Sequence, residues 1–314
     1  MNKTALLYLM LLCNVIRISA QDIQFTQFYA NPLYLNPAFA GSEYCPRMCI
    51  NYRNQWPNLS GTYVTYSASY DQYVSSIHGG LGVLVTSDNQ ARGTLKTTTA
   101  SLIYSYSTAI TRTFSVKAAL EATYFQKSLD RSKLNFGDMI DPRRGFVWNT
   151  NEVIPMQNKS NVDFSAGILG YSKHYFFGVS ADHLTQPDEG LLGPSRLPYK
   201  MTVHAGALIG LEKGNSSYIS PNILYQQQAN FSQLNLGVYF VKDHFVGGLW
   251  YRSNDAAILL IGLQSGNFKF GYSYDVTISR LANNTAGSHE ISMSLRVACK
   301  KKEKRYRPVS CPSF

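Results

Sequence analysis

The sequence predicts an all-β fold, a transmembrane antiparallel β-barrel of outer-membrane type with about 14 strands. Three observations support this prediction. Charged residues make up only 15% of the chain and aromatic residues reach 13%, whereas soluble domains carry about 25% charged residues. Apolar and polar side chains alternate at every second residue in many segments, which is typical of strands with two different faces. Short and long connections also alternate along the chain, as they do in outer-membrane barrels.

The composition excludes several other classes of protein. Disordered chains are rich in charge and poor in aromatic residues, and this chain is the opposite. The mean hydropathy is −0.16. After residue 20 the longest uninterrupted apolar run is Ala256–Leu263, far below the roughly 18 residues of a spanning helix. The net charge of +10 is concentrated in the last residues, so it gives only a weak indication of nucleic-acid binding, and we expect no such partner.

Residues 1–20 have the features of a signal peptide. Lys3 supplies a positive start, Ala5–Leu12 an apolar stretch, and Ser19 and Ala20 a small-residue cleavage site before Gln21. Processing as a lipoprotein at Cys13 is the alternative, but Leu12 stands where a small residue is needed. The chain is therefore expected to be exported from the cytoplasm.

Residues 21–44 form an aromatic and apolar segment interrupted by two Asn-Pro pairs. Such a segment is too apolar for a free periplasmic tail. We expect it to plug the lumen of the barrel or to pack on the base of the barrel. Partner binding is the second interpretation, with these candidate residues: Asn31, Pro32, Asn36 and Pro37.

Residues 45–299 are predicted to form the barrel. In Thr62–Asp71, for example, Val64 and Tyr66 alternate with Thr65 and Ser67. The predicted strands begin near Arg47, Thr62, Gly79, Thr97, Thr113, Val162, Tyr175, Lys200, Tyr218, Ser232, His244, Asp255, Asn267 and Ser288. In a bilayer such strands satisfy every backbone N–H and C=O group only if the sheet closes on itself.

The connections predict the orientation of the barrel. Tight turns at Ile110–Arg112 and Ser172–His174 fall on one end, and long insertions at Lys127–Asn161 and Leu184–Tyr199 fall on the other. An even strand number places the ends of the barrel in the periplasm, and the long insertions outside the cell. The first insertion is long enough to cap the outer mouth, and loops of this length are commonly functional.

One face of the predicted strands is apolar and is expected to contact lipid, whereas the other carries the charges. The candidate lumen charges are Arg53, Lys117, Glu121, Lys269, Asp275, Glu290 and Arg296. Aromatic residues near strand ends suit the interfacial girdles of such barrels; they are Trp56, Tyr104, Tyr106, Tyr124, Tyr251 and Tyr274.

Residues 300–314 form a basic tail that is expected in the periplasm. It could bind acidic partner surfaces or anionic groups beneath the membrane, or simply remain solvated. Its candidate partner-binding residues are Lys300, Lys301, Lys302, Lys304, Arg305 and Arg307. The exported cysteines are Cys45, Cys49, Cys299 and Cys311. Pairing of Cys45 with Cys49 needs a turn, because four strand residues span roughly 13 Å. Cys299 could pair with Cys311, or with Cys45 or Cys49 across neighbouring first and last strands, and free thiols are the further alternative.

The chain carries no motif that indicates an enzyme. His289-Glu290 lacks a second histidine four residues on, where Met293 stands, so the metalloprotease motif fails. No Gly-x-Ser-x-Gly turn is present, although a hydrolase triad is geometric rather than sequential. We predict a protein without catalytic activity, metal or cofactor.

An ordered series of motifs resembles the PorP/SprF family of type IX secretion system membrane proteins from Bacteroidetes. The series begins with the Asn-Pro opening of residues 21–41 and continues through Tyr52–Pro57, Phe136–Arg143, Asp163–Ile168, Asp182–Pro187, Gly271–Asp275 and Gly287–Ile291. The ending Cys311–Phe314 looks like the SprF type.

The resemblance implies an outer-membrane component that supports secretion or surface attachment of a large adhesin, in some members with gliding motility. It implies docking of cargo and of periplasmic partners, and no catalytic residues. The alternative is a diffusion channel or small-solute transporter of the same architecture, which the polar inner face also permits.

Overall fold

The computed structural model describes residues 22–59, 61–152, 158–211, 217–278 and 285–299. The predicted signal peptide and the basic tail lie outside the described residues, and so does Cys311. The barrel strands are β1 (Arg47–Gln55), β2 (Tyr63–Val74), β3 (Gly79–Gln90), β4 (Leu95–Ala109), β5 (Phe114–Leu129), β8 (Asn158–Ser172), β9 (Tyr175–Asp182), β10 (Lys200–Ala207), β12 (Ser217–Gln228), β13 (Phe231–Lys242), β14 (Phe245–Arg252), β15 (Ala256–Ser265), β16 (Phe268–Thr277) and β17 (Ser288–Arg296).

Short elements complete the fold. Residues near the amino terminus form η2 (Phe28–Ala30), α2 (Pro32–Leu35) and η3 (Pro37–Phe39), where η denotes a 3-10 helix. The connections hold η4 (Ser75–Ile77), η5 (Ala91–Gly93), η6 (Arg131–Lys133), η7 (Gly137–Met139), β6 (Ile140–Asp141), β7 (Gly145–Phe146) and β11 (Ile209–Gly210). Among the described residues, no helix is both long enough and apolar enough to cross a membrane.

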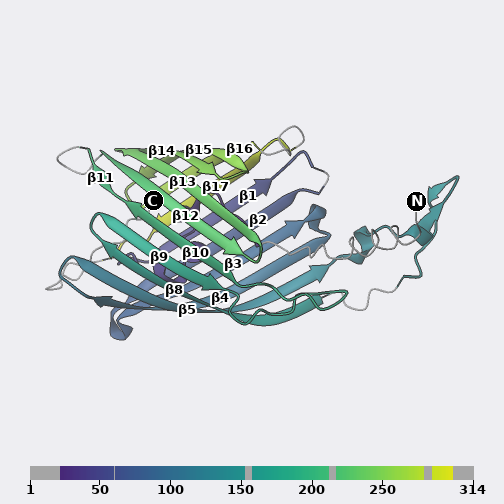
Figure 1. Cartoon of the computed structure of the whole chain (residues 1–314), viewed down its shortest axis with the longest axis horizontal. Coiled ribbons are helices and arrows are strands. Elements are labelled where there is room, and N and C mark those ends of the chain that lie inside the picture. Colours follow the sequence, from purple (N-terminus) through teal and green to yellow (C-terminus); the bar gives the residue numbers. More distant parts are fainter. Residues whose placement is uncertain (1–21, 60, 153–157, 212–216, 279–284, 300–314) are drawn as a thin grey trace, which may run out of the picture.

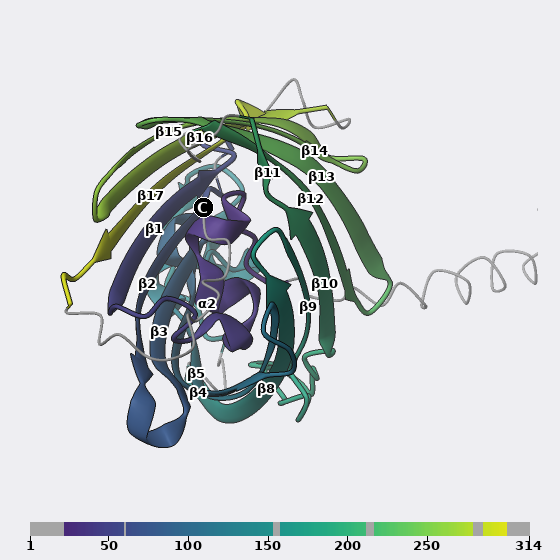
Figure 2. The same cartoon turned by 90° about the vertical axis from the view of Figure 1, so that its left-hand side faces the viewer.

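The 14 long strands close into one antiparallel barrel, as predicted (Figures 1 and 2). Neighbouring strands pair in sequence order. β1 pairs with β17, and β10 pairs with β12 although β11 lies between them in sequence. The strands begin within a few residues of the predicted positions, with β8 starting at Asn158 rather than near Val162. Closure gives each barrel strand a partner on both sides, which is what the bilayer core requires.

Burial is inverted relative to a soluble protein, and this confirms the predicted faces. On β2 the side chains of Thr65 and Ser67 are buried, whereas Tyr66 on the same strand is exposed. Leu102 on β4 and Leu120 on β5 also point outward, and each is 67% exposed. A surface that is apolar over the whole wall is soluble only in a lipid environment.

Residues 22–44, which we call the lumen segment, run through the inside of the barrel (Figure 2). Near its start, Asp22 contacts Gln228 at the last position of β12. Near its end, Gly41 contacts Asp71 beside the turn between β2 and β3. The segment therefore spans the lumen from the end with the long loops to the end with the tight turns, and β1 then returns through the wall.

The lumen segment is the centre of the apolar core. Its buried Phe28, Leu33 and Phe39 pack against inward apolar residues of the wall. The inner face is thus not uniformly polar: the wall contributes Leu84, Ile103, Leu169, Phe176, Leu224, Tyr239, Val241, Val246, Trp250, Ile258 and Leu260 to this core. Helix-breaking Asn-Pro pairs keep the segment in single turns that follow the narrow lumen, with Pro32 and Pro37 each at the first position of a turn.

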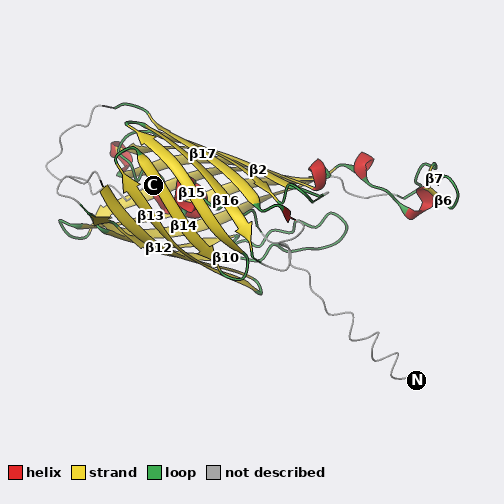
Figure 3. Ribbon diagram, turned by 90° about the horizontal axis from the view of Figure 1, so that it is seen from above, coloured by secondary structure: helices red, strands yellow, loops and turns green. Residues whose placement is uncertain are grey.

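The described part of the β5–β8 connection, residues 130–152, is long enough to cap the outer mouth but projects away from the barrel instead (Figure 3). Its tip is the β6–β7 hairpin, in which Ile140 pairs with Phe146. Asp141 accepts hydrogen bonds from the main-chain N–H groups of Arg143 and Arg144, so its carboxylate holds the turn. The tip is thus fixed by its own hydrogen bonds, whereas the base of the loop contacts the β3–β4 connection, where Lys133 donates to the carbonyl of Arg92.

A disulfide joins Cys45 to Cys299, which decides one of the alternatives left open by the sequence. It lies beyond the first pair of the β1–β17 ladder, Arg47 with Arg296. Cys49 is buried as a free thiol. The bridge therefore ties the point where the lumen segment leaves the barrel to the end of the last strand.

Candidate functional site

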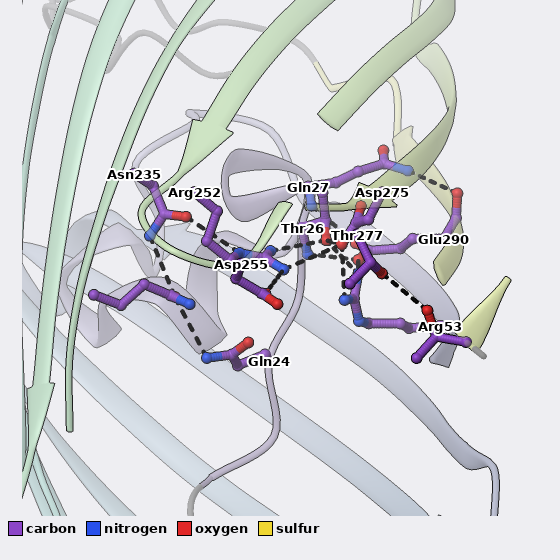
Figure 4. Close-up of polar contacts among 12 residues, drawn as sticks. Gln24, Thr26, Gln27, Arg53, Asn235, Arg252, Asp255, Asp275, Thr277 and Glu290 are labelled. Carbon is purple, nitrogen blue, oxygen red and sulfur yellow. Dashed lines mark hydrogen bonds and ion pairs between the residues drawn. The ribbon is translucent and has the colours of Figure 1, made fainter. Parts of the chain in front are cut away.

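The main candidate site is a buried ionic cluster in the lumen that binds the lumen segment (Figure 4). The guanidinium of Arg53 lies 2.9 Å from an Asp275 carboxylate oxygen and 3.3 Å from Glu290. Arg252 contacts the same oxygen of Asp275 at 3.1 Å. Two arginines and two carboxylates balance in charge, and a balanced and hydrogen-bonded cluster is the form in which buried charges are tolerated.

Strand parity and register bring these residues together. Arg53 and Glu290 occupy directly opposed positions of β1 and β17, and Asp275 and Arg252 point inward from β16 and β14. Period-two alternation places each on the polar face, but the Arg53–Glu290 pair exists only because the first and last strands meet.

Thr26 of the lumen segment sits at the centre of the cluster. Its hydroxyl donates to Asp275 at 2.7 Å and accepts from Arg252 at 3.0 Å and from Arg53. The hydroxyl group has one proton and two lone pairs, so these three contacts satisfy it completely.

Glu290 holds the main chain of the same stretch. Its two carboxylate oxygens accept from the N–H groups of Thr26 at 2.6 Å and Gln27 at 3.1 Å. The side chain of Gln27 donates to the Glu290 carbonyl and accepts from Ser292. Charge-assisted hydrogen bonds of this kind are about twice as strong as neutral ones.

Asn36 is the second point of attachment. Its amide nitrogen lies 3.2 Å from the carbonyls of both Ile168 and Val179, and 3.3 Å from the His204 ring. A Cβ atom on Gly167 would lie 2.2 Å from the Asn36 side-chain oxygen. One on Gly178 would lie 2.3 Å from the His204 ring and 3.0 Å from the Asn36 nitrogen. Glycine at these two positions therefore makes room for Asn36 and for the His204 ring that it contacts.

An aromatic enclosure holds the side chain of Tyr29 between these two attachments. Its ring lies 5.4 Å from that of Phe176, edge to face, and 6.3 Å from that of Trp250. The rings of Tyr239 and His204 lie within 6.5 Å. Such enclosures add to the burial free energy through favourable ring geometry.

The lumen segment ends at the side of the barrel with the tight turns, and this inner end is held through its main chain. The carbonyl of Ala40 accepts from Ser105 at 2.7 Å and from Lys117 at 2.5 Å. The N–H of Gly41 donates to Asp71, whose carboxylate also pairs with Arg47 at 2.9 Å. Gly41 has a φ of 60°, a left-handed conformation that glycine adopts without strain.

The lumen segment begins at the side of the barrel with the long loops, and this outer end is held by the carboxylate of Asp22. It lies 2.8 Å from the ring of His183 and 3.2 Å from the ammonium of Lys200, and Gln228 donates to it. The other ring nitrogen of His183 lies 2.5 Å from Asp163. Burial opposes the charged imidazolium, but the two carboxylates outweigh it and raise the pKa of His183 to about 10. Burial raises the pKa of the Asp22 carboxyl, but the positive charges of His183 and Lys200 outweigh this effect and hold that pKa below its usual range.

The predicted site residues fall in three places. Arg53, Asp275 and Glu290 meet in the central cluster, and Lys117 binds the inner end. Glu121 accepts from Thr123 and stands apart from the central cluster. Arg296 contacts Glu43 at the inner end, and Lys269 is half-buried on β16.

The Asn-Pro residues lie inside the barrel. Asn31, Pro32, Asn36 and Pro37 are buried, so in this structure they contact the wall rather than a partner. The candidate residues Lys300, Lys301, Lys302, Lys304, Arg305 and Arg307 lie outside the described residues.

Sequence reasoning missed several contributors. Thr26 and Gln27 are ordinary polar residues, and no local pattern distinguishes them. Arg252 follows the inward parity of Val246, Gly248 and Trp250 on β14, so extending the alternation through that strand would have found it. Inward glycines such as Gly167 and Gly178 are a weak signal for close approach of another backbone.

The fold and the wall define an outer-membrane β-barrel whose lumen is occupied by its own amino-terminal segment. A family model described as type IX secretion system membrane protein PorP/SprF matches residues 18–295. The chain belongs to this family, and it is an outer-membrane component of the type IX secretion system. The match covers the PorP and SprF types alike, so assignment to the SprF type stays a prediction.

Solved structures show the same kind of fold at low identity. The toluene transporter TbuX of Ralstonia pickettii is 10% identical with a TM-score of 0.50, and the match covers 85% of this chain and 93% of that chain. The P. putida toluene transporter TodX is 9% identical with a TM-score of 0.50, covering 84% and 93%. At these identities the likeness concerns the fold alone. Among curated proteins, no sequence match is significant.

Proposed function

We propose that this protein is a non-enzymatic docking component that supports secretion or surface attachment of a large adhesin, including adhesins that serve gliding. It acts by binding cargo and periplasmic partners at its loops and termini, while the wall anchors it in outer-membrane lipid. The observation that carries this proposal is the filled lumen: the lumen segment is held at its two ends and at two points between them, so the first contact with a partner falls to the ends of the barrel.

The projecting β5–β8 loop is the best candidate for contact with cargo. Phe146 and Trp148 at its tip are 58% and 59% exposed, although both are large and apolar. The loop lies at the end with the long connections, which faces the outside in barrels of this type. Exposed aromatic residues on a projecting element are typical anchors of protein interfaces.

The test is deletion of the gene followed by immunostaining of type IX cargo on whole cells. Loss of one surface adhesin, restored by the wild-type gene, is expected. Complementation with a Phe146→Ser/Trp148→Ser variant should fail, while a Leu192→Ser variant, at a residue that is 76% exposed in another loop, should succeed. Normal display of every cargo in the deletion strain would refute the proposal.

A small-solute channel is the second candidate function. The fold is shared with two proteins described as toluene transporters, and that likeness is its only specific support. Conductance in planar bilayers separates the two functions. We expect little stable conductance, whereas large open pores formed by the intact chain would favour the channel.

A further inference from the structure

Side chains of the wall bind the main chain of the lumen segment at successive levels of the barrel. Glu290 accepts from two consecutive N–H groups, at Thr26 and Gln27. Further along, Ser180 donates to the carbonyl of Leu35, and Arg47 to that of Phe39. Further main-chain contacts are those of Gln228 with Asp22, of Ser105 and Lys117 with Ala40, and of Asp71 with Gly41.

Contacts of this kind recognise a polypeptide rather than one particular sequence. Main-chain groups are common to every segment, and complexes that bind peptides use them for affinity while pockets supply specificity. We propose that the lumen is a peptide-binding site, occupied in the resting protein by residues 22–44, which a segment of the secreted partner displaces.

Two side-chain pockets define the peptide that fits. The enclosure around Tyr29 accepts an aromatic ring, and the gap at Gly167 and Gly178 accepts a small amide. Asn36 lies seven positions after Tyr29 in the sequence. The partner segment is therefore a partly extended peptide of about 20 residues, with an aromatic residue followed seven positions later by asparagine.

The attachment of the lumen segment makes displacement directional. Its inner end is fixed covalently by the Cys45–Cys299 bridge. Its outer end is held only through Asp22 and neighbouring contacts, and the side chains of Asp22 and His183 are 16% and 19% exposed, whereas Asn36 is fully buried. A competing peptide at the outer mouth meets the most accessible contact first, so exchange begins at Asp22 and proceeds inward.

Peptide exchange tests this inference, which rests on the proposed docking function. A protease site is inserted between Glu43 and Tyr44 of the full chain, and the folded protein is cut in detergent. A fluorescent synthetic peptide of residues 22–43 is then added, and its binding is measured by fluorescence anisotropy. We expect one peptide to bind each cut barrel and a scrambled peptide of equal composition to bind at least 100-fold more weakly.

Modified peptides examine main-chain recognition directly. Replacing the amide before Thr26 or before Gln27 by an ester removes one N–H that Glu290 accepts and leaves the side chains unchanged. Each ester should weaken binding about 10-fold, since a hydrogen bond to a charged group contributes about 1.5 kcal/mol or more. An ester before Asn31 is the matched control, because among the described residues the Asn31 main-chain N–H donates to no carboxylate of the wall. This ester should change binding less than 3-fold.

Failure to take up the peptide while the cut barrel stays folded overturns the inference, and so does equal binding of all three esters. If cutting unfolds the barrel, the uncut Asp22→Asn variant is used with a photoreactive peptide of residues 22–43. Crosslinks to lumen residues support exchange, and their absence overturns it. Either failure leaves display of the adhesin dependent on the gene, so it is distinguishable from failure of the docking function.

Discussion

Substitution of Glu290 by glutamine should greatly destabilise the protein. The carboxylate is fully buried and accepts two main-chain N–H groups of the lumen segment at 2.6 and 3.1 Å. It also lies 3.3 Å from Arg53. Hydrogen bonds to a charged group contribute about 1.5–3 kcal/mol each, and an ion pair that loses one buried partner costs about 3–5 kcal/mol. These two effects overlap, because glutamine retains one acceptor.

We therefore expect Glu290→Gln to lower the free energy of unfolding by about 3–5 kcal/mol, a large fraction of the total of about 5–15 kcal/mol. The reason is the buried positive charge that is left without a partner. In the absence of the Glu290 carboxylate, the guanidinium groups of Arg53 and Arg252 share the single carboxylate of Asp275. Asp255 relieves only Arg252, at 3.3 Å and from a partly exposed position.

The assay is urea unfolding in lipid vesicles, followed by tryptophan fluorescence, with the midpoint and slope both fitted. The Arg53→Gln/Glu290→Gln double variant restores the charge balance and serves as the matched control. Its loss of stability should be smaller than the sum of the two single losses by about 2 kcal/mol. A Glu290→Gln protein within about 0.5 kcal/mol of the wild type, or additive single effects, would refute the electrostatic account of the cluster.

Three further predictions concern the Asn36 attachment, the outer end of the lumen segment and the wall. Gly167→Ala places a Cβ 2.2 Å from the Asn36 oxygen and should lower the free energy of unfolding by about 1–3 kcal/mol. In the Asn36→Ala background the same substitution should cost less, which a comparison of unfolding midpoints measures. His183→Gln should destabilise at neutral pH. The contribution of His183 is complete below about pH 6.5 and is lost as pH rises through about 10, because its folded pKa is raised; unfolding midpoints of the two proteins should therefore converge near pH 10.5, and a constant gap would contradict the assignment. Leu102→Lys on the outward face should cost about 2–4 kcal/mol in vesicles, against about 0–1 for Tyr106→Lys near the strand end, and equal costs would show that Leu102 does not lie at the bilayer centre.

The wall could be predicted because its evidence is local. The alternation of Thr65, Tyr66 and Ser67 identifies both faces of β2 without reference to any other strand. The same rule placed Arg53, Asp275 and Glu290 inside. It could not show that Arg53 and Glu290 are neighbours, since they are 237 residues apart and meet only through closure of the barrel.

The lumen segment was only partly predictable. Its composition indicated that water would not solvate it, but both the lumen and the base of the barrel satisfy that requirement. Its direction depends on contacts such as Asp22 with His183, which are 161 residues apart. The β5–β8 loop was also only partly predictable. Its length was evident from the sequence, whereas its path depends on contacts such as the turn held by Asp141.

The contacts of the lumen segment also restrict the order of assembly. Thr26 and Gln27 bind strands β14, β16 and β17, while Asn36 binds β8, β9 and β10. The segment thus reaches opposite parts of the wall although it precedes every strand in sequence. Such long-range contacts form late, after the loops between them have closed. A lumen segment that already lies between the strands when β1 and β17 pair makes all of these contacts as the wall closes around it. We therefore expect the wall and the lumen segment to fold together, and the Cys45–Cys299 disulfide then holds the β1–β17 ladder closed.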